Sequence, residues 1–337
     1  MVLGSVLIID ILVFFLLYSI LSLALHLQFG YTGILNVGIY IYPMIGGFIL
    51  AIVPFRLAMI IFNVDPRLDF VADNPIVVRI LNDYLARNPL TSVGLLLFTI
   101  AVVIIVAMLV SWLISYPLLR LEGAYQKIFT LAVAECLRVI GLQYFPIAGG
   151  VFGLGIPNIF KWLGDFDWVG PIALTACIFA IILLLIIKLC NSPFGRLLKA
   201  IRENALAVES LGKDVTKTQK IIMVFSSAIA ALVGVLYCLI FMTVTPEAFN
   251  VDDFSFWCIA MIVLGGTGNN WGVLIGVLTI IILRRISYIS RNYITSLPFD
   301  IAWLEPIMLG TLILLFLIYR STGILPEKPT TIKKQVN

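Results

Sequence analysis

Long apolar stretches follow one another along this chain, and they restrict its fold more than any other feature. A transmembrane helix needs about 20 mostly apolar residues. Only 12% of the 337 residues are charged, against roughly 25% in soluble domains. The first stretch lacks the cationic start and cleavage site of a signal peptide, so we expect it to be retained. The candidate spans are roughly 2–27, 34–62, 91–114, 124–147, 169–190, 221–245, 254–264 with 271–283, and 303–319.

One interruption between these stretches, from Lys188 to Lys220, is a short basic loop. Short basic loops between spans are cytoplasmic under the positive-inside rule. Residues 193–211 carry apolar side chains at helical spacing, and Gly212 can close the helix. We predict an amphipathic cytoplasmic helix that contacts a partner, with a helix on the membrane surface as the alternative. Its apolar stripe consists of Leu197, Leu198, Ile201, Ala205, Val208 and Leu211.

Counting spans from this loop gives a topology for most of the chain. The turn 115–123 lies inside, whereas 149–168, the turn 246–253 and the slightly acidic insert 63–90 lie outside. The topology is inconsistent near the C-terminus. With a cytoplasmic tail, 254–302 must begin and end outside. The segments 254–264 and 271–283 are then half-helices or strongly tilted spans, and the basic loop 284–302 lies outside against the rule.

The two short segments are separated by the sequence GGTGNN, residues 265–270. A broken helix is tolerated in a bilayer only where protein or a water-filled cavity satisfies the backbone, and transporters use such breaks at substrate passages. Small residues also allow helices to pack closely. We favour a functional role for 265–270 and a packing role for Gly46 and Gly47.

No enzyme motif is present in the sequence. His26 is the only histidine, and neither a GxSxG nucleophile motif nor an HExxH metal motif occurs. We expect His26 to lie at the membrane interface. The sequence contains no GxxxxGK[ST] phosphate loop, so active transport would require an ATPase on another chain. The five scattered cysteines form no CxxC pair, which argues against a zinc site or disulfide framework. No basic patch suggests nucleic-acid binding.

Several polar residues fall within the predicted spans. Asp10 lies in the first span, and Glu135 and Arg138 lie three residues apart in the fourth, so they share a helix face and can pair. Buried charge is costly in lipid and usually faces a bundle interior or a water path. A structural ion pair is the alternative for Glu135 and Arg138. Three neutral groups could line a pathway or join helices by hydrogen bonds: Gln28, Asn36 and Thr130.

Five fragments in the same order resemble one known family, the integral membrane permeases of branched-chain amino acid ABC transporters of the Liv type, and more closely their M-type subunit. The fragments are LHLQFGYTGILNVG (25–38), RLEGAYQKIFTLAVAECLR (120–138), GGVFGLGIP (149–157), SPFGRLLKAIRENALAVESLG (192–212) followed by TPE (245–247) and VLGGTGNNWGVLIG (263–276), and RSTGIL (320–325).

The resemblance implies an all-α polytopic membrane protein of about 8–10 transmembrane helices, including broken or re-entrant segments, in the cell membrane. The permease domain would cover 1–325 and a cytoplasmic tail 326–337. The expected partners are a second homologous permease, two cytoplasmic ABC ATPases and an extracytoplasmic binding protein, with ATP bound only by the ATPases. The insert 63–90 could dock the binding protein. The resemblance also makes 193–212 the coupling helix that docks on the ATPase, with these residues: Arg196, Arg202, Glu203, Glu209 and Gly212.

The expected cargo is a branched-chain or similar apolar amino acid. Urea, short amides, nucleosides or sugars are the alternatives, because related permeases share the coupling pattern. Tyr40 and Tyr42 are bulkier than the family's usual residues, so the second span can present a different surface to the passage. The tentative pathway residues are Gln28, Asn36, Thr130, Glu135, Arg138, Thr267 and Asn269.

Overall fold

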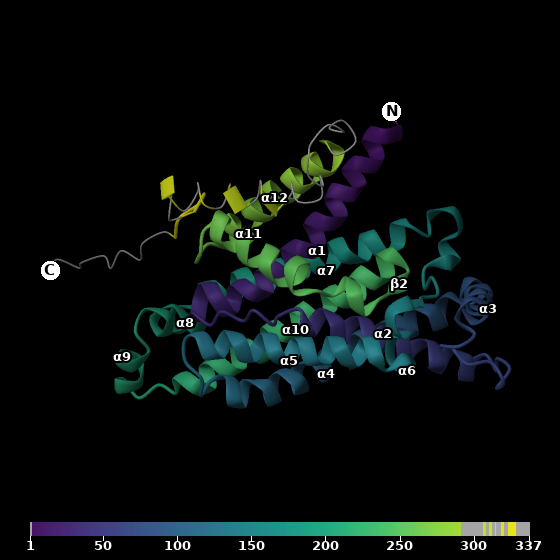
Figure 1. The fold of residues 1–337 in the computed structure, drawn as a ribbon, viewed down its shortest axis with the longest axis horizontal. Coiled ribbons are helices and arrows are strands. Elements are labelled where there is room, and N and C mark those ends of the chain that lie inside the picture. The colour runs from purple at the N-terminus through teal and green to yellow at the C-terminus, as the bar shows by residue number, and fades with distance from the viewer. Residues whose placement is uncertain are drawn as a thin grey trace.

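The computed structural model describes residues 2–290, 306–307, 310–311, 314, 318–319 and 323–327. It is an elongated bundle of helices (Figure 1). Among the described residues, six helices are long and apolar enough to cross a membrane. They are α1 (Val2–Thr32), α2 (Ile41–Ile61), α4 (Pro89–Leu118), α7 (Val169–Asn191), α10 (Val215–Phe241) and α12 (Asn270–Ser290). The prediction of an all-α polytopic protein is confirmed, and the predicted span 303–319 lies mostly outside the described residues.

A further span is bent. Helix α5 (Ala124–Gln143) meets α6 (Phe145–Ala148) and the 3-10 turn η1 (Gly150–Phe152) at 92°. This turn leads into a short outer segment, where β1 (Leu154–Gly155) pairs antiparallel with β2 (Thr243–Val244). The predicted fourth span is therefore a broken segment, of the kind that the family resemblance implied.

Helix α10 lies at the centre of the bundle, against α1, α2 and α4 (Figure 1). Its approach to α2 depends on two glycines. A Cβ atom on Gly234 would collide with the carbonyl of Pro43, and one on Gly46 with the carbonyl of Ala231. Small residues let transmembrane backbones approach closely and gain van der Waals contact. The predicted packing role of Gly46 agrees with this crossing.

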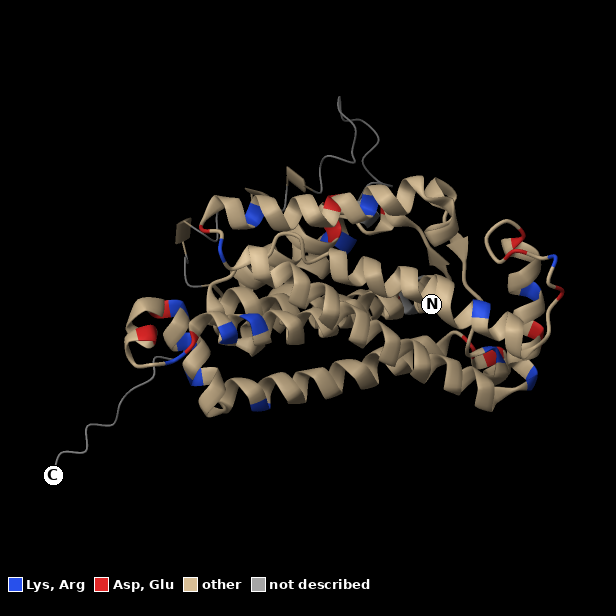
Figure 2. Ribbon diagram, turned by 90° about the horizontal axis from the view of Figure 1, so that it is seen from below, with Lys and Arg blue, Asp and Glu red and all other residues tan. Residues whose placement is uncertain are grey.

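The insert 63–90 and the segment 149–168 lie together at one end of the bundle. The insert contains α3 (Asn74–Arg87), which packs on the 3-10 helix η2 (Lys161–Phe166). The Asn74 side chain accepts a hydrogen bond from Gly155 N (2.9 Å) and donates one to Gly155 O (3.1 Å). Figure 2 shows charged residues gathered here and at the opposite end of the bundle. Both segments predicted to be external thus occupy one end.

Of the two segments after α10 that were predicted to be half-helices or strongly tilted spans, the first is short and the second is long enough to cross a membrane. The 3-10 turn η3 (Pro246–Ala248) and the π-helical turn η4 (Asp252–Phe256) lead into α11 (Trp257–Gly265), which packs along α12. Helix α12 continues to Ser290, well beyond the predicted end at 283. Arg284 and Arg285 are therefore helical rather than in a loop. They form ion pairs with Asp253 and Asp10 on neighbouring elements.

Candidate functional site

The predicted coupling helix 193–212 consists of two helices, α8 (Pro193–Glu203) and α9 (Ala205–Ser210). The prediction of one continuous helix is wrong. The break falls at Asn204, whose extended backbone (φ −157°, ψ 96°) ends α8 and whose side chain accepts a hydrogen bond from Ala207 N at 3.0 Å. Asparagine is a preferred N-cap because its side chain satisfies a free backbone N–H at the start of a helix.

Gly212 closes α9 as predicted. It has a positive φ of 76°, which glycine adopts without the steric penalty of a Cβ atom. Gly212 N donates to Glu209 O at 2.8 Å, and Lys213 N donates to Val208 O at 3.4 Å. This pair of bonds is the Schellman pattern that satisfies the last carbonyls of a helix.

The apolar stripe of this region mostly faces its own protein. Leu198, Ile201 and Val208 are buried, and the last two form a small cluster with Val215 at the start of α10. The α8 part of the stripe therefore packs on α1 and α7. Leu211, the last residue of the predicted stripe, and Leu206, which is not part of it, are exposed, with exposed fractions of 80% and 75%.

The charges on α8 divide into two sets. Arg196 and Glu203 are exposed, as is Glu209 on α9. Arg202 and Lys199 instead face the bundle. Arg202 donates to Gly30 O at the end of α1 (2.5 Å) and pairs with Glu327 (2.7 Å). Lys199 pairs with the other carboxylate oxygen of Glu327 at 2.6 Å.

The segment 323–327 therefore lies between α8 and the inner end of α11. Ile324 N donates to Leu264 O (2.9 Å) and Leu325 N donates to Gly265 O (3.0 Å), so this segment satisfies carbonyls that the end of α11 leaves free. Partial burial tends to raise the pKa of Glu327, but hydrogen bonds from Lys199 and Arg202 outweigh it, and the net pKa is lowered. We call Lys199, Arg202 and Glu327 the inner clasp.

The sequence GGTGNN forms the turn between α11 and α12 beside the inner clasp. A Cβ atom on Gly268 would touch Glu327 and Arg202. Thr267 is exposed, and Asn269 caps α12 by accepting a hydrogen bond from Trp271 N at 3.1 Å. These two candidate pathway residues therefore lie at the α8 end of the bundle.

Gln28 and Asn36 lie where α1 turns into α2. The Gln28 side-chain amide donates to Ser226 Oγ on α10. Asn36 is 2% exposed, and its side-chain oxygen has no hydrogen-bond partner among the described residues. His26 is fully buried against Tyr31, so its side chain contacts its own protein rather than lipid or water.

Glu135 and Arg138 form the ion pair that their spacing predicted, with Arg138 Nη2 2.6 Å from Glu135 Oε1. The Tyr40 hydroxyl donates to Glu135 Oε2 at 3.1 Å, so this departure from the family pattern adds a partner for the carboxylate. Thr130, also on α5, is buried, and its backbone carbonyl packs against Gly38. No hydrogen bond or ion pair among the described residues joins Thr130, Glu135 or Arg138 to Thr267 or Asn269.

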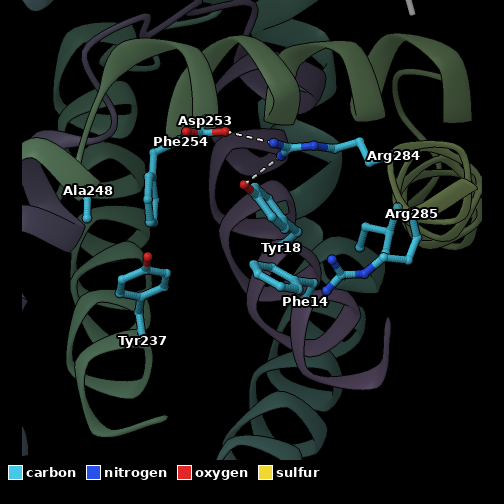
Figure 3. A pocket seen from close by; sticks show the side chains of 9 residues that line it. Phe14, Tyr18, Tyr237, Ala248, Asp253, Phe254, Arg284 and Arg285 are labelled. Carbon is cyan, nitrogen blue, oxygen red and sulfur yellow. Dashed lines mark hydrogen bonds and ion pairs between the residues drawn. The ribbon is translucent and has the colours of Figure 1, made fainter. Parts of the chain in front are cut away.

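A second group of charges, which the sequence reasoning did not assemble, lines a cavity of about 250 Å³ between α1, α10, η4 and α12. Asp253 Oδ1 lies 3.0 Å from Arg284 Nη2, and Arg284 Nη1 donates to the Tyr18 hydroxyl at 3.1 Å (Figure 3). Arg285 pairs with Asp10. The sequence places Asp10 inside the first predicted span, and the two consecutive arginines at 284 and 285 are the signal that could have indicated its partner.

Comparison with known proteins agrees with this architecture. Residues 7–317 match the family described as "Branched-chain amino acid transport system / permease component". The "Probable branched-chain amino acid transport permease protein LivM" of Methanocaldococcus jannaschii is 34% identical over 324 residues, covering 95% of this chain and 93% of that protein.

Two bacterial relatives, each named "High-affinity branched-chain amino acid transport system permease protein LivM", come from Salmonella typhimurium and Escherichia coli. Each is 28% identical over 241 residues, which cover 64% of this chain and 54% of the relative. No solved structure matches the chain. The chain is a multi-pass membrane protein, and it belongs to the family of branched-chain amino acid transport permease components of the Liv type.

Proposed function

We propose that this chain is the permease subunit of an ABC importer for branched-chain or similar apolar amino acids, and that separate cytoplasmic subunits bind and hydrolyse the ATP. The observation that carries the proposal is the surface of α8 and α9. There Leu206 and Leu211 are exposed beside Glu203 and Glu209. An apolar pair with charges around it suits a partner's groove, where buried apolar anchors supply affinity and rim charges supply orientation.

The inner clasp offers a route for movement from α8 into the bundle. Arg202 joins α8 to the end of α1, and Glu327 joins it to the segment that caps α11. A shift of α8 on ATP binding would therefore pull on α1 and on the turn 265–270 together. Such rigid-body rocking of helices exposes a passage on alternate sides of the membrane.

The proposed complex contains a second homologous permease, two ATPases and an extracytoplasmic binding protein, with no nucleic acid. The insert 63–90 is the proposed docking surface for the binding protein, since its helix α3 packs on the segment 154–167 at the end opposite α8. Outside this complex the chain needs no cofactor of its own.

The proposed passage has two sections. Thr267 and Asn269 lie in the turn 265–270 beside the inner clasp and belong to the inner section. Gln28, Asn36 and Thr130 extend this section, since Gly38, two residues after Asn36, packs on the Thr130 carbonyl. Glu135 and Arg138 belong to a section nearer the outer turn, where Glu247 is 3.9 Å from Arg138. Unchanged uptake in assembled complexes after Glu135→Ala and Asn269→Ala would remove both residues from the passage.

The test is ATP-dependent uptake of labelled leucine in proteoliposomes that contain the whole complex and its binding protein. Leu206→Ser/Leu211→Ser and Glu203→Ala/Glu209→Ala are compared with Leu184→Ser, which makes the same change at a residue 60% exposed on α7, away from both proposed docking surfaces. We expect uptake to collapse in the first two and to persist in the control.

Two outcomes would contradict the proposal. Full uptake and full retention of the ATPases by both double variants would exclude the exposed surface of α8 and α9 as the coupling element. ATPase stimulation by the binding protein without leucine uptake would keep the importer and change its cargo to urea, short amides, nucleosides or sugars.

A further inference from the structure

The cavity between α1, α10, η4 and α12 is charged in a part of the molecule where charge is expensive. Tyr18 precedes the inner end of α1 by 14 residues, and Arg284 follows the start of α12 by 14 residues. At 1.5 Å per residue both lie about 21 Å from the inner end, which places them in the outer half of a core about 30 Å thick. Ionisable groups at such depth mark substrate pathways more often than structure alone.

Among the described residues, each arginine that lines this cavity pairs with a carboxylate. Arg284 pairs with Asp253, which also lines the cavity, and Arg285 pairs with Asp10 on α1. Both arginines also lie near aromatic rings, with Arg284 Cζ 4.8 Å from the Trp257 centroid and Arg285 Cζ 5.5 Å from that of Phe14. A zwitterion can bind among these paired charges without changing the net charge of the site, because the ammonium of the ligand contacts the carboxylates and the carboxylate of the ligand contacts the arginines.

The inner side of the cavity is apolar. Phe14, Tyr18, Tyr237 and Phe254 line this side, and behind them a recess of only about 10 Å³ extends to Leu21 and Val233, about one helical turn deeper on α1 and α10. The four rings suit an apolar side chain held within the cavity itself, whereas the charges lie nearer the outer end. The cavity of about 250 Å³ is slightly below the roughly 300–1,000 Å³ of pockets for larger ligands.

The backbone that supplies Asp253 and Phe254 is unusual. Both residues belong to η4, a five-residue π-helical turn. Such turns are rare and occur frequently at functional sites. Figure 3 shows the Asp253 carboxylate turned toward Arg284 and the Phe254 ring facing the cavity from the same turn. The turn thus gives the cavity a charge and an apolar wall from adjacent residues.

We propose that this cavity is a binding site for an apolar α-amino acid on its way through the membrane. The ligand's ammonium contacts Asp253, its carboxylate contacts Arg284 and its side chain lies within the cavity against Phe14, Tyr237 and Phe254. Binding inserts the zwitterion into the Asp253–Arg284 pair and so joins η4 to α12 through the ligand. The inference rests on the proposed transport of amino acids and names where in the outer half the cargo is held.

The test measures binding of labelled leucine by equilibrium dialysis to the assembled permease and ATPase complex in nanodiscs, without the binding protein. The variants are Asp253→Asn, Arg284→Gln and Ala248→Leu, the last of which fills the cavity from η3. The control is Asp167→Asn, which alters an ion pair with Lys161 (3.1 Å) outside the cavity. We expect the leucine dissociation constant to rise about tenfold or more in the charge variants and to stay unchanged in the control.

Ligand chemistry gives a second readout that a structural ion pair would not affect. Leucine should compete with the label, whereas analogues that lack either the ammonium or the carboxylate should compete at least about tenfold less well. Ala248→Leu should weaken leucine binding more than alanine binding, because it shortens the space for the side chain.

Three results would overturn the proposal. Leucine binding by correctly assembled Asp253→Asn and Arg284→Gln complexes at the wild-type level would make these pairs purely structural. Competition by both analogues equal to that by leucine would do the same. The third result combines two observations: unlabelled leucine does not compete with the label, and binding of the label differs between nanodiscs with and without phosphatidylethanolamine. It would assign the cavity to a zwitterionic lipid headgroup. Wild-type uptake of leucine measured alongside separates these failures from a failure of the proposed transport function.

Discussion

Helices α7 and α10 are both long and apolar, but the protein uses them differently. In the most apolar 18-residue window of each, 67% of α10 is buried inside the chain and only 17% of α7. In water the exposure of so many apolar side chains on α7 would be unfavourable. In a bilayer the lipid is as apolar as leucine, so apolarity alone does not drive a helix into the bundle.

The difference between them lies in side-chain size and polarity. One face of α10 carries small residues that let α2 and α4 approach: Ser226, Ser227, Ala230, Ala231 and Gly234. The middle of α7 reads IFAIILLLII, which is bulky throughout. Small residues at a helix interface are the basis of close packing in membranes. The comparison therefore predicts that size changes are harmful on α10 and tolerated on α7.

The largest effect is expected from Gly234→Leu. A side chain at this position collides with the backbone of Pro43, and a backbone cannot move aside as a flexible side chain can. Overpacking of this kind costs about 3 kcal/mol or more. We expect no monodisperse protein by fluorescence-detected size-exclusion chromatography. Gly94→Leu on α4 is the control, because no atom lies within 4 Å of its added Cβ, and wild-type behaviour of Gly234→Leu would refute the crossing.

Removal of side-chain volume should separate the two helices next. Leu236 on α10 is 1% exposed and Leu184 on α7 is 60% exposed. We expect Leu236→Ala to lower the free energy of unfolding by roughly 2 kcal/mol or more through the cavity it leaves. Leu184→Ala should change it by less than about 0.5 kcal/mol. Unfolding of each variant in a detergent titration measures both values, and equal losses would show that α7 is also buried.

Removal of a charge from the inner clasp, which holds the helix α8 that follows α7, should lower the free energy of unfolding by less. Glu327→Gln removes the charge that pairs with Lys199 and Arg202, both partly exposed, so we expect a loss of about 1 kcal/mol or less. The pKa of Glu327 is lowered from its ordinary value of 4.5. The clasp therefore contributes fully above pH 4.5 and is lost as the pH falls through the lowered pKa.

Thermal unfolding at several pH values checks this prediction. Wild type and Glu327→Gln should differ at pH 7 and converge in acid, below pH 4.5. A difference that persists in strong acid would mean that the glutamine acts through lost packing rather than lost charge.

The smallest effect is expected from single hydroxyl groups. The Ser227 hydroxyl on α10 shares its proton between Ala107 O on α4 (3.3 Å) and Val224 O in its own helix (2.7 Å), whereas Thr175 on α7 donates to Pro171 O within its own helix at 2.7 Å. Hydrogen bonds between membrane helices contribute about 0.6 kcal/mol on average. Ser227→Ala should cost about that amount, and Thr175→Ala, as its counterpart, should not weaken contacts between helices. A reversed order would mean that the α4–α10 contact needs no hydrogen bond.

Local spacing predicted several features correctly. The Glu135–Arg138 pair follows from residues three apart on one helix, and the closure of α9 at Gly212 follows from the ability of glycine to adopt a positive φ. The break at Asn204 was missed, although asparagine is a known N-cap, because the apolar spacing continues across it. The same spacing gave the stripe Leu198, Ile201 and Val208 but not the side to which it packs.

Long-range pairs were beyond such reasoning. Glu327 and Arg202 are 125 residues apart, and Asp253 and Arg284 are 31 apart on different elements. Neither spacing corresponds to a helical or strand period, so no local pattern predicts these pairs. The cavity in Figure 3 was missed for the same cause, because its walls come from α1, α10, η3, η4 and α12.

By itself, the sequence determined that this chain is a helical membrane protein of the Liv permease family, and it located most of the spans and the basic region between α7 and α10. The reason is local: in lipid every backbone polar group must be satisfied within its own segment, so a long apolar stretch becomes a helix whatever surrounds it. Only the tertiary structure decided that α10 is central and α7 peripheral, that Glu327 closes on α8 and that two ion pairs share one cavity. These depend on the fit of surfaces distant in the chain, which no single stretch specifies.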